Sequence, residues 1–293
     1  MNFTLLDGGM GQELMARSKV KPTGLWATKT LMDMPELIEA VHADYFTAGA
    51  DVATTNSYAI HRDRLIPFDI EDQFVDLHVQ ACEIASRARD KHGSGLIAGS
   101  AGPTGASYRP ELSLEVEQGA EVYAEVARIQ EPFVDVILLE TLASVKQAAG
   151  AVMGASSVGK PVWLSVSVDD DDGSKLRSGE NLTDVLPLLD QGADALLINC
   201  SIPEAVNTAM AIVSQPLAAQ SIPFGAYANG FTKISDAFKQ DGSTVDSLES
   251  RKDLDPAAYQ GFAETWHGHG ARIIGGCCEV GPAHISALAQ RFK

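Results

Sequence analysis

Basic residues are scarce in this sequence, and the shortage excludes several classes of partner. Lysine and arginine together number 22 against 39 aspartates and glutamates, so the formal net charge is −17. Nucleic acids and anionic membrane surfaces attract basic patches, so we expect neither as a partner. No apolar run reaches the roughly 20 residues that a membrane-spanning helix needs. Residues 1–7 lack the basic and apolar regions of a secretion signal, which predicts a cytoplasmic protein.

Cysteine is the other scarce residue, with four in 293 positions. Cys277 and Cys278 are adjacent, and chain neighbours form a disulfide poorly because their Cα atoms lie too close together. Cys200 also follows an apolar run, whereas Cys82 falls within a helical pattern and is expected in the core. Three cysteines without a fourth are typical of a zinc site that keeps one position open for chemistry. Buried apolar side chains or a redox pair are the alternatives.

Short apolar runs alternate with helical patterns along the whole chain, and this alternation predicts the fold. The runs are Phe3–Leu6, Asp51–Thr55, Leu96–Gly99, Val134–Leu139, Val162–Val168, Ala195–Asn199, Pro223–Ala228 and Ala271–Ile274. Eight strand-then-helix units favour an α/β fold in which residues 1–293 form a single (β/α)₈ barrel with its active site at the C-terminal mouth. An open doubly wound sheet is the alternative, but no G-x-G-x-x-G follows the first run. A barrel would bring Cys200 to Cys277 and Cys278.

The helical segments carry several boundary signals. Apolar residues recur at helical spacing in Pro35–Ala48, Ile70–Lys91 and Ser113–Gln130. Ser201 and Glu204 have the spacing of a capping box, with Ser201 as N-cap. Glycine precedes the next strand at the ends of three helices, where the left-handed conformation suits it; these are Gly49, Gly192 and Gly270. The polar stretch Gln240–Asp255 is expected to be a surface loop.

The sequence as a whole resembles the zinc-dependent homocysteine S-methyltransferases. This family includes the S-methylmethionine and betaine:homocysteine methyltransferases and the homocysteine-binding module of methionine synthase. The resemblance rests on Leu6–Gly11, Leu25-Trp26, Gly49–Asp51, Thr54–Tyr58, Gly102-Pro103, Glu140-Thr141, Leu176–Glu180, Asn199–Ser201 and Gly275–Cys278. The most specific part is the pair of Asn199-Cys200 with Gly275–Cys278. One departure is Ala228, where the family usually has proline, so we expect an altered loop after the seventh strand.

The resemblance implies an enzyme that transfers a methyl group to homocysteine and forms methionine. It implies that Cys200, Cys277 and Cys278 bind Zn²⁺. Asp7 and Glu140 match the carboxylates that hold the amino-acid end of homocysteine, and Asn229 matches an asparagine near the metal. Backbone N–H groups around Gly8 and Gly9 suit the substrate carboxylate.

The methyl donor is a further expectation. A sulfonium is expected, S-methylmethionine first and S-adenosylmethionine second, because it leaves as a neutral thioether. A betaine-type or other-thiol methyltransferase, or a non-enzymatic barrel with structural zinc, is the alternative. The partners would be these small molecules.

Several of these residues have structural alternatives. Asp7 could cap a helix or stabilise a turn, Glu140 could form a structural ion pair, and Asn229 could shape a turn with Gly230. His267 and His269 are expected at the surface, and His284 in helix packing. The acidic run Asp169–Asp172 is expected to be a solvated turn, or else a funnel for a cationic donor.

Overall fold

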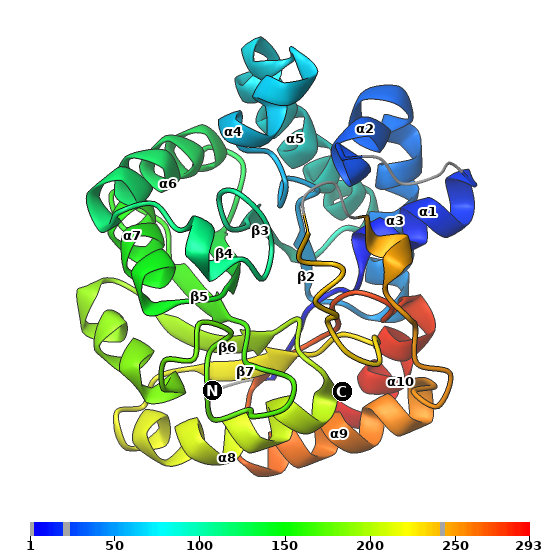
Figure 1. Ribbon diagram of the computed structural model, residues 1–293. Helices are drawn as coiled ribbons and strands as arrows, with labels where there is room; N and C mark the ends of the chain where they lie inside the picture. The colour runs from blue at the N-terminus through cyan, green and yellow to red at the C-terminus, as the bar shows by residue number, and fades with distance from the viewer. Residues whose placement is uncertain (1–2, 20–23, 241–243) are drawn as a thin grey trace.

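The strands of the protein form a parallel, closed barrel in the computed structural model, which describes residues 3–19, 24–240 and 244–293 (Figure 1). The eight-stranded sheet has the order β1-β8-β7-β6-β5-β4-β3-β2. A parallel bridge between Leu6 and Val52 joins the two ends of this order and closes the ring. The strands are β1 (Thr4–Leu5), β2 (Val52–Thr54), β3 (Leu96–Ala101), β4 (Val136–Leu142), β5 (Val162–Val166), β6 (Ala195–Asn199), β7 (Phe224–Tyr227) and β8 (Ile273–Ile274).

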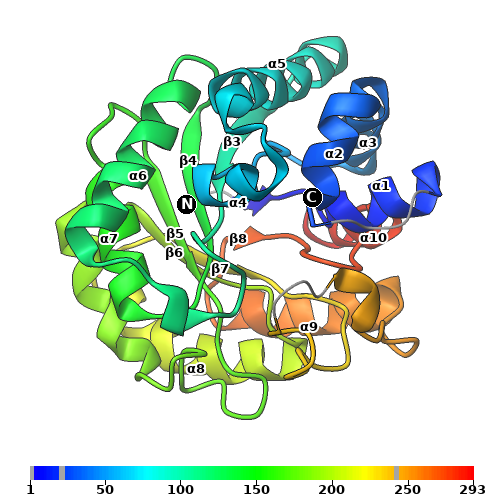
Figure 2. The ribbon, with the colours of Figure 1, turned by 45° about the horizontal axis from the view of Figure 1, so that its top comes forward.

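Helices surround the barrel on its outer side, as both views of the ribbon show (Figures 1 and 2). The α-helices are α1 (Met10–Ser18), α2 (Trp26–Asp33), α3 (Pro35–Ala48), α4 (Arg62–Leu65), α5 (Phe74–His92), α6 (Val116–Gln130), α7 (Val145–Ala155), α8 (Pro203–Ala219), α9 (Pro256–Gly268) and α10 (Pro282–Phe292). The 3₁₀ helices are η1 (Ile66–Phe68), η2 (Glu71–Gln73), η3 (Pro110–Leu112), η4 (Leu182–Gln191) and η5 (Val245–Ser247). None of the helices in the described ranges is long and apolar enough to cross a membrane.

The predicted (β/α)₈ barrel is confirmed, with shifts at the element ends. Each of the eight apolar runs overlaps a strand, and α3 has the predicted bounds. The largest difference is in β4, which continues to Leu142, so Glu140 lies within the strand and not after it. The connection between β5 and β6 is the 3₁₀ helix η4, which contains Pro187. Proline lacks the N–H that continues an α-helix.

Alternation along the strands separates the barrel interior from the helix-facing core. Val136 and Leu138 belong to the small apolar cluster inside the barrel, together with Ala98, Leu197 and Tyr227. Successive side chains of a strand point to opposite faces. Glu140, two residues beyond Leu138, therefore points into the barrel at its C-terminal end.

The capping prediction for α8 was wrong. The helix begins at Pro203 with Ile202 as N-cap and has no side-chain cap. The Ser201 hydroxyl instead donates to the carbonyl of Val168 at 2.8 Å and accepts from its N–H at 2.9 Å. Ser201 thus joins the ends of two neighbouring strands, a tertiary demand that overrides the local capping pattern.

The glycine predictions are confirmed in conformation. Gly49, Gly192 and Gly270 have φ of 107°, 125° and 103°. Gly49 and Gly192 directly follow their helices, whereas α9 ends at Gly268 with His269 as its C-cap.

The polar stretch Gln240–Asp255 is more than the surface loop that its composition predicts. Residues 241–243 lie outside the described ranges. Leu248 is buried and packs in one cluster with Phe231, Ile234 and Cys200. This segment therefore covers part of the barrel mouth.

Candidate active site

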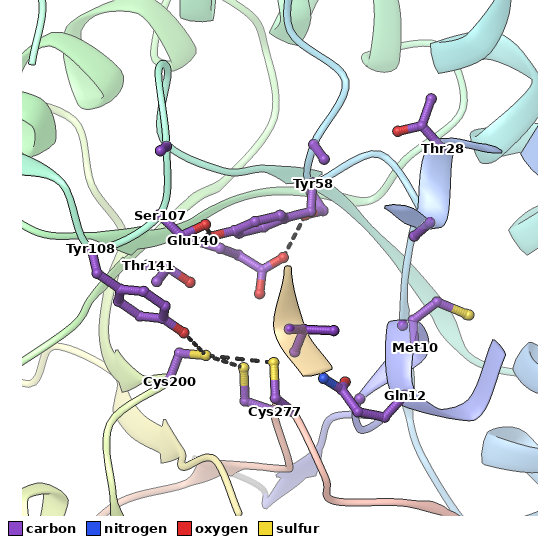
Figure 3. Close-up of a pocket in the computed structure, with 18 of the residues that line it drawn as sticks. Met10, Gln12, Thr28, Tyr58, Ser107, Tyr108, Glu140, Thr141, Cys200 and Cys277 are labelled. Carbon is purple, nitrogen blue, oxygen red and sulfur yellow. Dashed lines mark hydrogen bonds between the residues drawn. The ribbon is translucent and has the colours of Figure 1, made fainter. Parts of the chain in front are cut away.

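A cavity of about 530 Å³ opens at the C-terminal end of the barrel. This volume lies within the usual range of small-molecule sites. Its wall contains Asp7, Gly8 and Glu140 as well as the three cysteines Cys200, Cys277 and Cys278. Figure 3 shows Glu140 and the cysteine sulfurs in one space, with the Glu140 carboxylate pointing toward the sulfur side. The sequence-predicted residues from four strand ends thus meet in one pocket.

Cys200 occupies the position immediately after β6. Its backbone has φ +50°, a left-handed conformation that non-glycine residues seldom adopt. The Cys200 N–H donates to the carbonyl of Tyr227 at 3.2 Å, which extends the pairing with β7 by one step. The pairing of β6 with β7 therefore fixes the backbone position from which the Cys200 thiol points into the cavity.

Cys277 and Cys278 lie in the loop after β8, which packs against two other strand ends. The Cys277 N–H donates to Ala228 at 3.0 Å, and the Cys278 carbonyl accepts from Gly230 N–H at 2.8 Å. A Cβ atom at Gly8 would lie 2.1 Å from the carbonyl oxygen of Val280, so only glycine permits this close approach. The N–H of Gly9, which the sequence left available for a ligand, donates to the same Val280 carbonyl at 2.9 Å.

The three thiols are arranged as metal ligands would be. All are free, and their sulfurs lie within 4.8 Å of one another. Tetrahedral zinc with Zn–S bonds of about 2.3 Å separates its sulfurs by about 3.8 Å. Cys200 to Cys278, at 3.9 Å, fits this spacing, while Cys200 to Cys277, at 2.9 Å, would open by about 0.9 Å. The cluster contains no fourth His, Cys, Asp or Glu within the described ranges, so the donor set fits zinc with one position open.

Glu140 is held by hydroxyl groups and not by a cation. Its carboxylate accepts a hydrogen bond from Ser100 Oγ and a second from Tyr227 Oη at 3.1 Å. No ion pair of Glu140 occurs within the part of the chain that is described, which removes the structural ion pair as an alternative. Burial raises the pKa of Glu140 to about 7, although these two hydrogen bonds act in the opposite direction and lower it.

Asp7 is held in a similar way at the end of β1. Its carboxylate accepts from the Thr54 N–H at 2.7 Å and from Thr54 Oγ1 at 2.8 Å. The N-cap of α1 is Gly9, so Asp7 does not have the helix-capping role that the sequence left open. Burial raises the pKa of Asp7 to about 7, and the nearby Glu140 charge contributes in the same direction. Two buried carboxylates that have no cationic partner among the described residues can bind an ammonium group.

Asn229 lies behind the pocket wall. It is fully buried, and its Oδ1 accepts from the N–H of Phe231 at 3.1 Å, which is the turn role predicted as its alternative. Asn229 is not one of the residues that line the cavity. Its Nδ2 has no hydrogen-bond partner among the described residues.

The prediction of a solvated acidic turn was wrong for one of its four residues. Asp170 is buried and accepts from Arg177 at 3.0 and 3.2 Å. It also accepts from the N–H groups of Ile202 and Ile234 at 3.1 and 2.9 Å. Asp171 and Asp172 are exposed. Asp170 therefore ties together the loops that follow three strands.

The histidines take structural positions. His267 packs against Phe3 and Phe292, and His269 is exposed. A ring nitrogen of His284 accepts from Gly281 N–H at 3.3 Å, and the other lies 3.1 Å from the Leu254 carbonyl.

Sequence reasoning missed two polar residues of the cavity. The hydroxyl of Tyr108 lies 2.9 Å from Cys200 Sγ (Figure 3). Gln12 also lines the cavity, and both polar atoms of its side-chain amide are buried without a partner in the described ranges. Neither residue follows a strand directly, so the strand-end signal could not identify them.

Comparisons with known proteins show what the chain as a whole is similar to. Residues 4–292 match the profile of a family described as homocysteine S-methyltransferase. The homocysteine S-methyltransferase of Escherichia coli (strain K12) is 31% identical over 311 residues, covering 99% of this chain and 95% of that protein. Homocysteine S-methyltransferase YbgG of Bacillus subtilis (strain 168) is 29% identical over 313 residues, covering 97% and 93%. The crystal structure of the homocysteine methyltransferase MmuM from E. coli in its metallated form matches with a TM-score of 0.81, 28% identity and coverage of 99% and 96%.

Proposed function

This chain belongs to the homocysteine S-methyltransferase family, and from its site we propose a zinc-dependent reaction that methylates homocysteine to methionine with a sulfonium donor. The observation that carries the proposal is one cavity with three converging thiols and two buried carboxylates whose partners in the described part of the chain are uncharged donors. We further propose that residues 1–293 act as one homocysteine-binding barrel.

Cys200, Cys277 and Cys278 would hold the zinc ion. When bound, zinc lowers the pKa of a thiol that joins its coordination sphere, so that the thiol is present as the reactive thiolate. The spacing of the sulfurs and the absence of a fourth ligand of these types from the cluster support this assignment.

Homocysteine would lie between the cysteines and the carboxylates. Its ammonium group would contact Asp7 and Glu140, which then ionise because a positive charge offsets the cost of burial. Its carboxylate would lie near Gly8 and the first turn of α1, which lines the cavity and has no side-chain cap. Asn229 would support the loop near the metal. These contacts would aim the substrate sulfur at the donor.

The methyl transfer itself is a single displacement. A lone pair of the homocysteine thiolate forms the new S–C bond, and the electrons of the old S–C bond leave with the donor as a neutral thioether. No proton is needed by that leaving group. The donor would bind beside the cysteines, where the aromatic rings of Tyr58, Tyr108 and Phe231 line the cavity and favour a sulfonium over an anion.

Product analysis tests the proposal and separates the donors. Zinc-loaded protein would be incubated with homocysteine and S-methylmethionine, S-adenosylmethionine or betaine, each in turn. S-methylmethionine should give two methionines for each homocysteine consumed, because its own thioether product is also methionine. S-adenosylmethionine should give one methionine and one S-adenosylhomocysteine, as the second-ranked sulfonium.

Two outcomes would contradict the proposal. Methionine formation with betaine alone would assign the betaine-type reaction. No turnover with any of the three donors, while zinc remains bound, would favour another thiol acceptor or a structural zinc site.

A further inference from the structure

Tyr108 contacts the cysteine cluster directly. Among the hydrogen bonds of the described residues, it is the one aromatic side chain whose polar atom contacts a cysteine sulfur. Its Oη lies 2.9 Å from Cys200 Sγ, and its side chain is 5% exposed. A metal-binding cysteine is a thiolate, which can only accept a hydrogen bond. The Tyr108 hydroxyl would therefore be the donor in the metal-loaded protein.

The backbone at Tyr108 is in an unfavourable conformation. Its φ is +61°, in the left-handed region where a side chain bearing a Cβ is disfavoured. Cys200, its partner, also has positive φ, at +50°. Such conformations persist where surrounding contacts determine them, and they concentrate at functional sites. Here they direct the phenol and the thiol toward each other.

A buried ion pair supports both sides of this contact. The Arg177 guanidinium carbon lies 4.7 Å from the centroid of the Tyr108 ring. The same guanidinium donates to the backbone carbonyl of Cys200 at 3.1 Å. Arg177 is fixed by Asp170, and their side chains are 4% and 2% exposed. Phe238 contacts the Tyr108 ring at a centroid distance of 6.0 Å.

We propose that Tyr108 is a positioning residue that donates a hydrogen bond to the Cys200 thiolate, with Arg177 holding both partners in place. This inference rests on the proposed function, in which Cys200 is a zinc ligand. A hydrogen bond withdraws electron density from the sulfur that accepts it, so the Cys200 thiolate becomes a weaker nucleophile toward the methyl group of the donor. The substrate thiolate then remains the preferred nucleophile. The hydrogen bond also fixes the direction of the Cys200 side chain, as partners of metal ligands commonly do.

Cobalt substitution tests the hydrogen bond without relying on turnover. The probe is Co²⁺, whose thiolate complexes have a sulfur-to-metal charge-transfer band. Tyr108→Phe keeps the ring and its contact with Arg177 but removes the donor. Its band should move to longer wavelength than in the wild type, because the sulfur lone pair loses a stabilising interaction. Tyr123→Phe is the matched control, since the buried Tyr123 hydroxyl donates to the Gly102 carbonyl at 2.9 Å and Tyr123 is not one of the residues that line the cavity. Its band should stay at the wild-type wavelength.

Alkylation provides a second readout. In zinc-loaded Tyr108→Phe, iodoacetamide should modify Cys200 about tenfold faster than in the wild type. In the wild type, alkylation of Cys200 must break the hydrogen bond from Tyr108 to the charged sulfur, and the variant lacks this bond. The rate at Cys278 is the internal control and should not change.

The outcomes distinguish the inference from the function on which it rests. An unshifted band and an unchanged alkylation rate in metal-loaded Tyr108→Phe would overturn the role of Tyr108 alone. A wild-type protein that binds cobalt without a thiolate charge-transfer band would overturn the metal site, and the role of Tyr108 with it.

Discussion

The cysteine side and the carboxylate side of the cavity both consist of acidic groups that are anionic when ionised, but they differ in what would neutralise that charge. Cys200, Cys277 and Cys278 come from loops after β6 and β8, and they present soft sulfur ligands within 4.8 Å of one another. Asp7 follows β1 and Glu140 lies in β4, and the donors that hold their carboxylates among the described residues carry no full charge. Soft thiolates select metal ions such as zinc, whereas carboxylates in this setting suit an ammonium group.

On the proposed function, this difference would let one pocket bind both ends of an amino thiol. A single kind of site would bind the sulfur or the ammonium, but could not orient the molecule between them. Two anionic sides also favour a cationic methyl donor over an anionic one. Substitutions that remove the cysteine ligands or the carboxylate charge one at a time test whether the two sides have separate roles.

Loss of the cysteine side should have the largest effect. Cys278→Ala leaves two protein thiols, and we expect loss of stoichiometric zinc and a fall in methyl transfer on the order of 10³-fold or more, because metal activation of the thiol is lost. Metal analysis and turnover would be measured on the same sample. Cys82→Ala is the control, since Cys82 is a buried cysteine of α5 outside the cavity, and it should retain zinc. Full zinc occupancy and turnover in Cys278→Ala would contradict the assignment.

Loss of charge on the carboxylate side should act mainly on substrate binding. Glu140→Gln keeps the shape of the side chain and can accept from one of Ser100 and Tyr227 while its amide NH2 donates to the other hydroxyl, but it removes the negative charge near the ammonium. We expect KM for homocysteine to rise about 10- to 100-fold, from the energy of a charged hydrogen bond, with a small change in kcat. Steady-state kinetics would measure both constants. Glu264→Gln, an exposed change on α9, should leave them at the wild-type values, and a kcat-only effect of Glu140→Gln would count against ammonium binding.

The smallest effect should appear in stability without substrate. Burial raises the pKa of Asp7 from 3.8 to about 7. Below about pH 4, Asp7 is protonated in the folded and the unfolded state, so it does not lower the free energy of unfolding of the wild type. As the pH rises from about 4 to 7, the unfolded state loses this proton first, and the wild type becomes less stable. Asp7→Asn should raise Tm by a few degrees at pH 8 and by little at pH 4, as measured by thermal unfolding. If the difference in Tm between wild type and Asp7→Asn were the same at pH 8 and pH 4, ionisation of Asp7 would not lower the stability of the wild type.

The cysteine side was more accessible to sequence reasoning than the loops around it. Cys200 directly follows β6 and Cys277 lies three residues after the end of β8. Parallel barrel strands end at one mouth, so the convergence of these cysteines could be predicted. Asp170 looks the same as Asp171 in sequence, and what distinguishes it are its contacts with Arg177 and with the N–H groups of Ile202 and Ile234 in later loops. Ser201 has a capping pattern, but its contact with Val168 decides its role. Tyr108 depends on a loop backbone at φ +61°, which no local pattern indicates.

Calorimetric binding of three ligands tests the two-sided pocket most directly. Homocysteine, homoserine without the sulfur, and 4-mercaptobutanoate without the ammonium would be titrated into wild-type, Cys278→Ala and Glu140→Gln protein in the presence of zinc. We predict that Cys278→Ala weakens binding of homocysteine and 4-mercaptobutanoate but leaves that of homoserine unchanged. Glu140→Gln should weaken binding of homocysteine and homoserine but leave that of 4-mercaptobutanoate unchanged. Equal losses for all three ligands in either variant would contradict the separation of sulfur and ammonium binding.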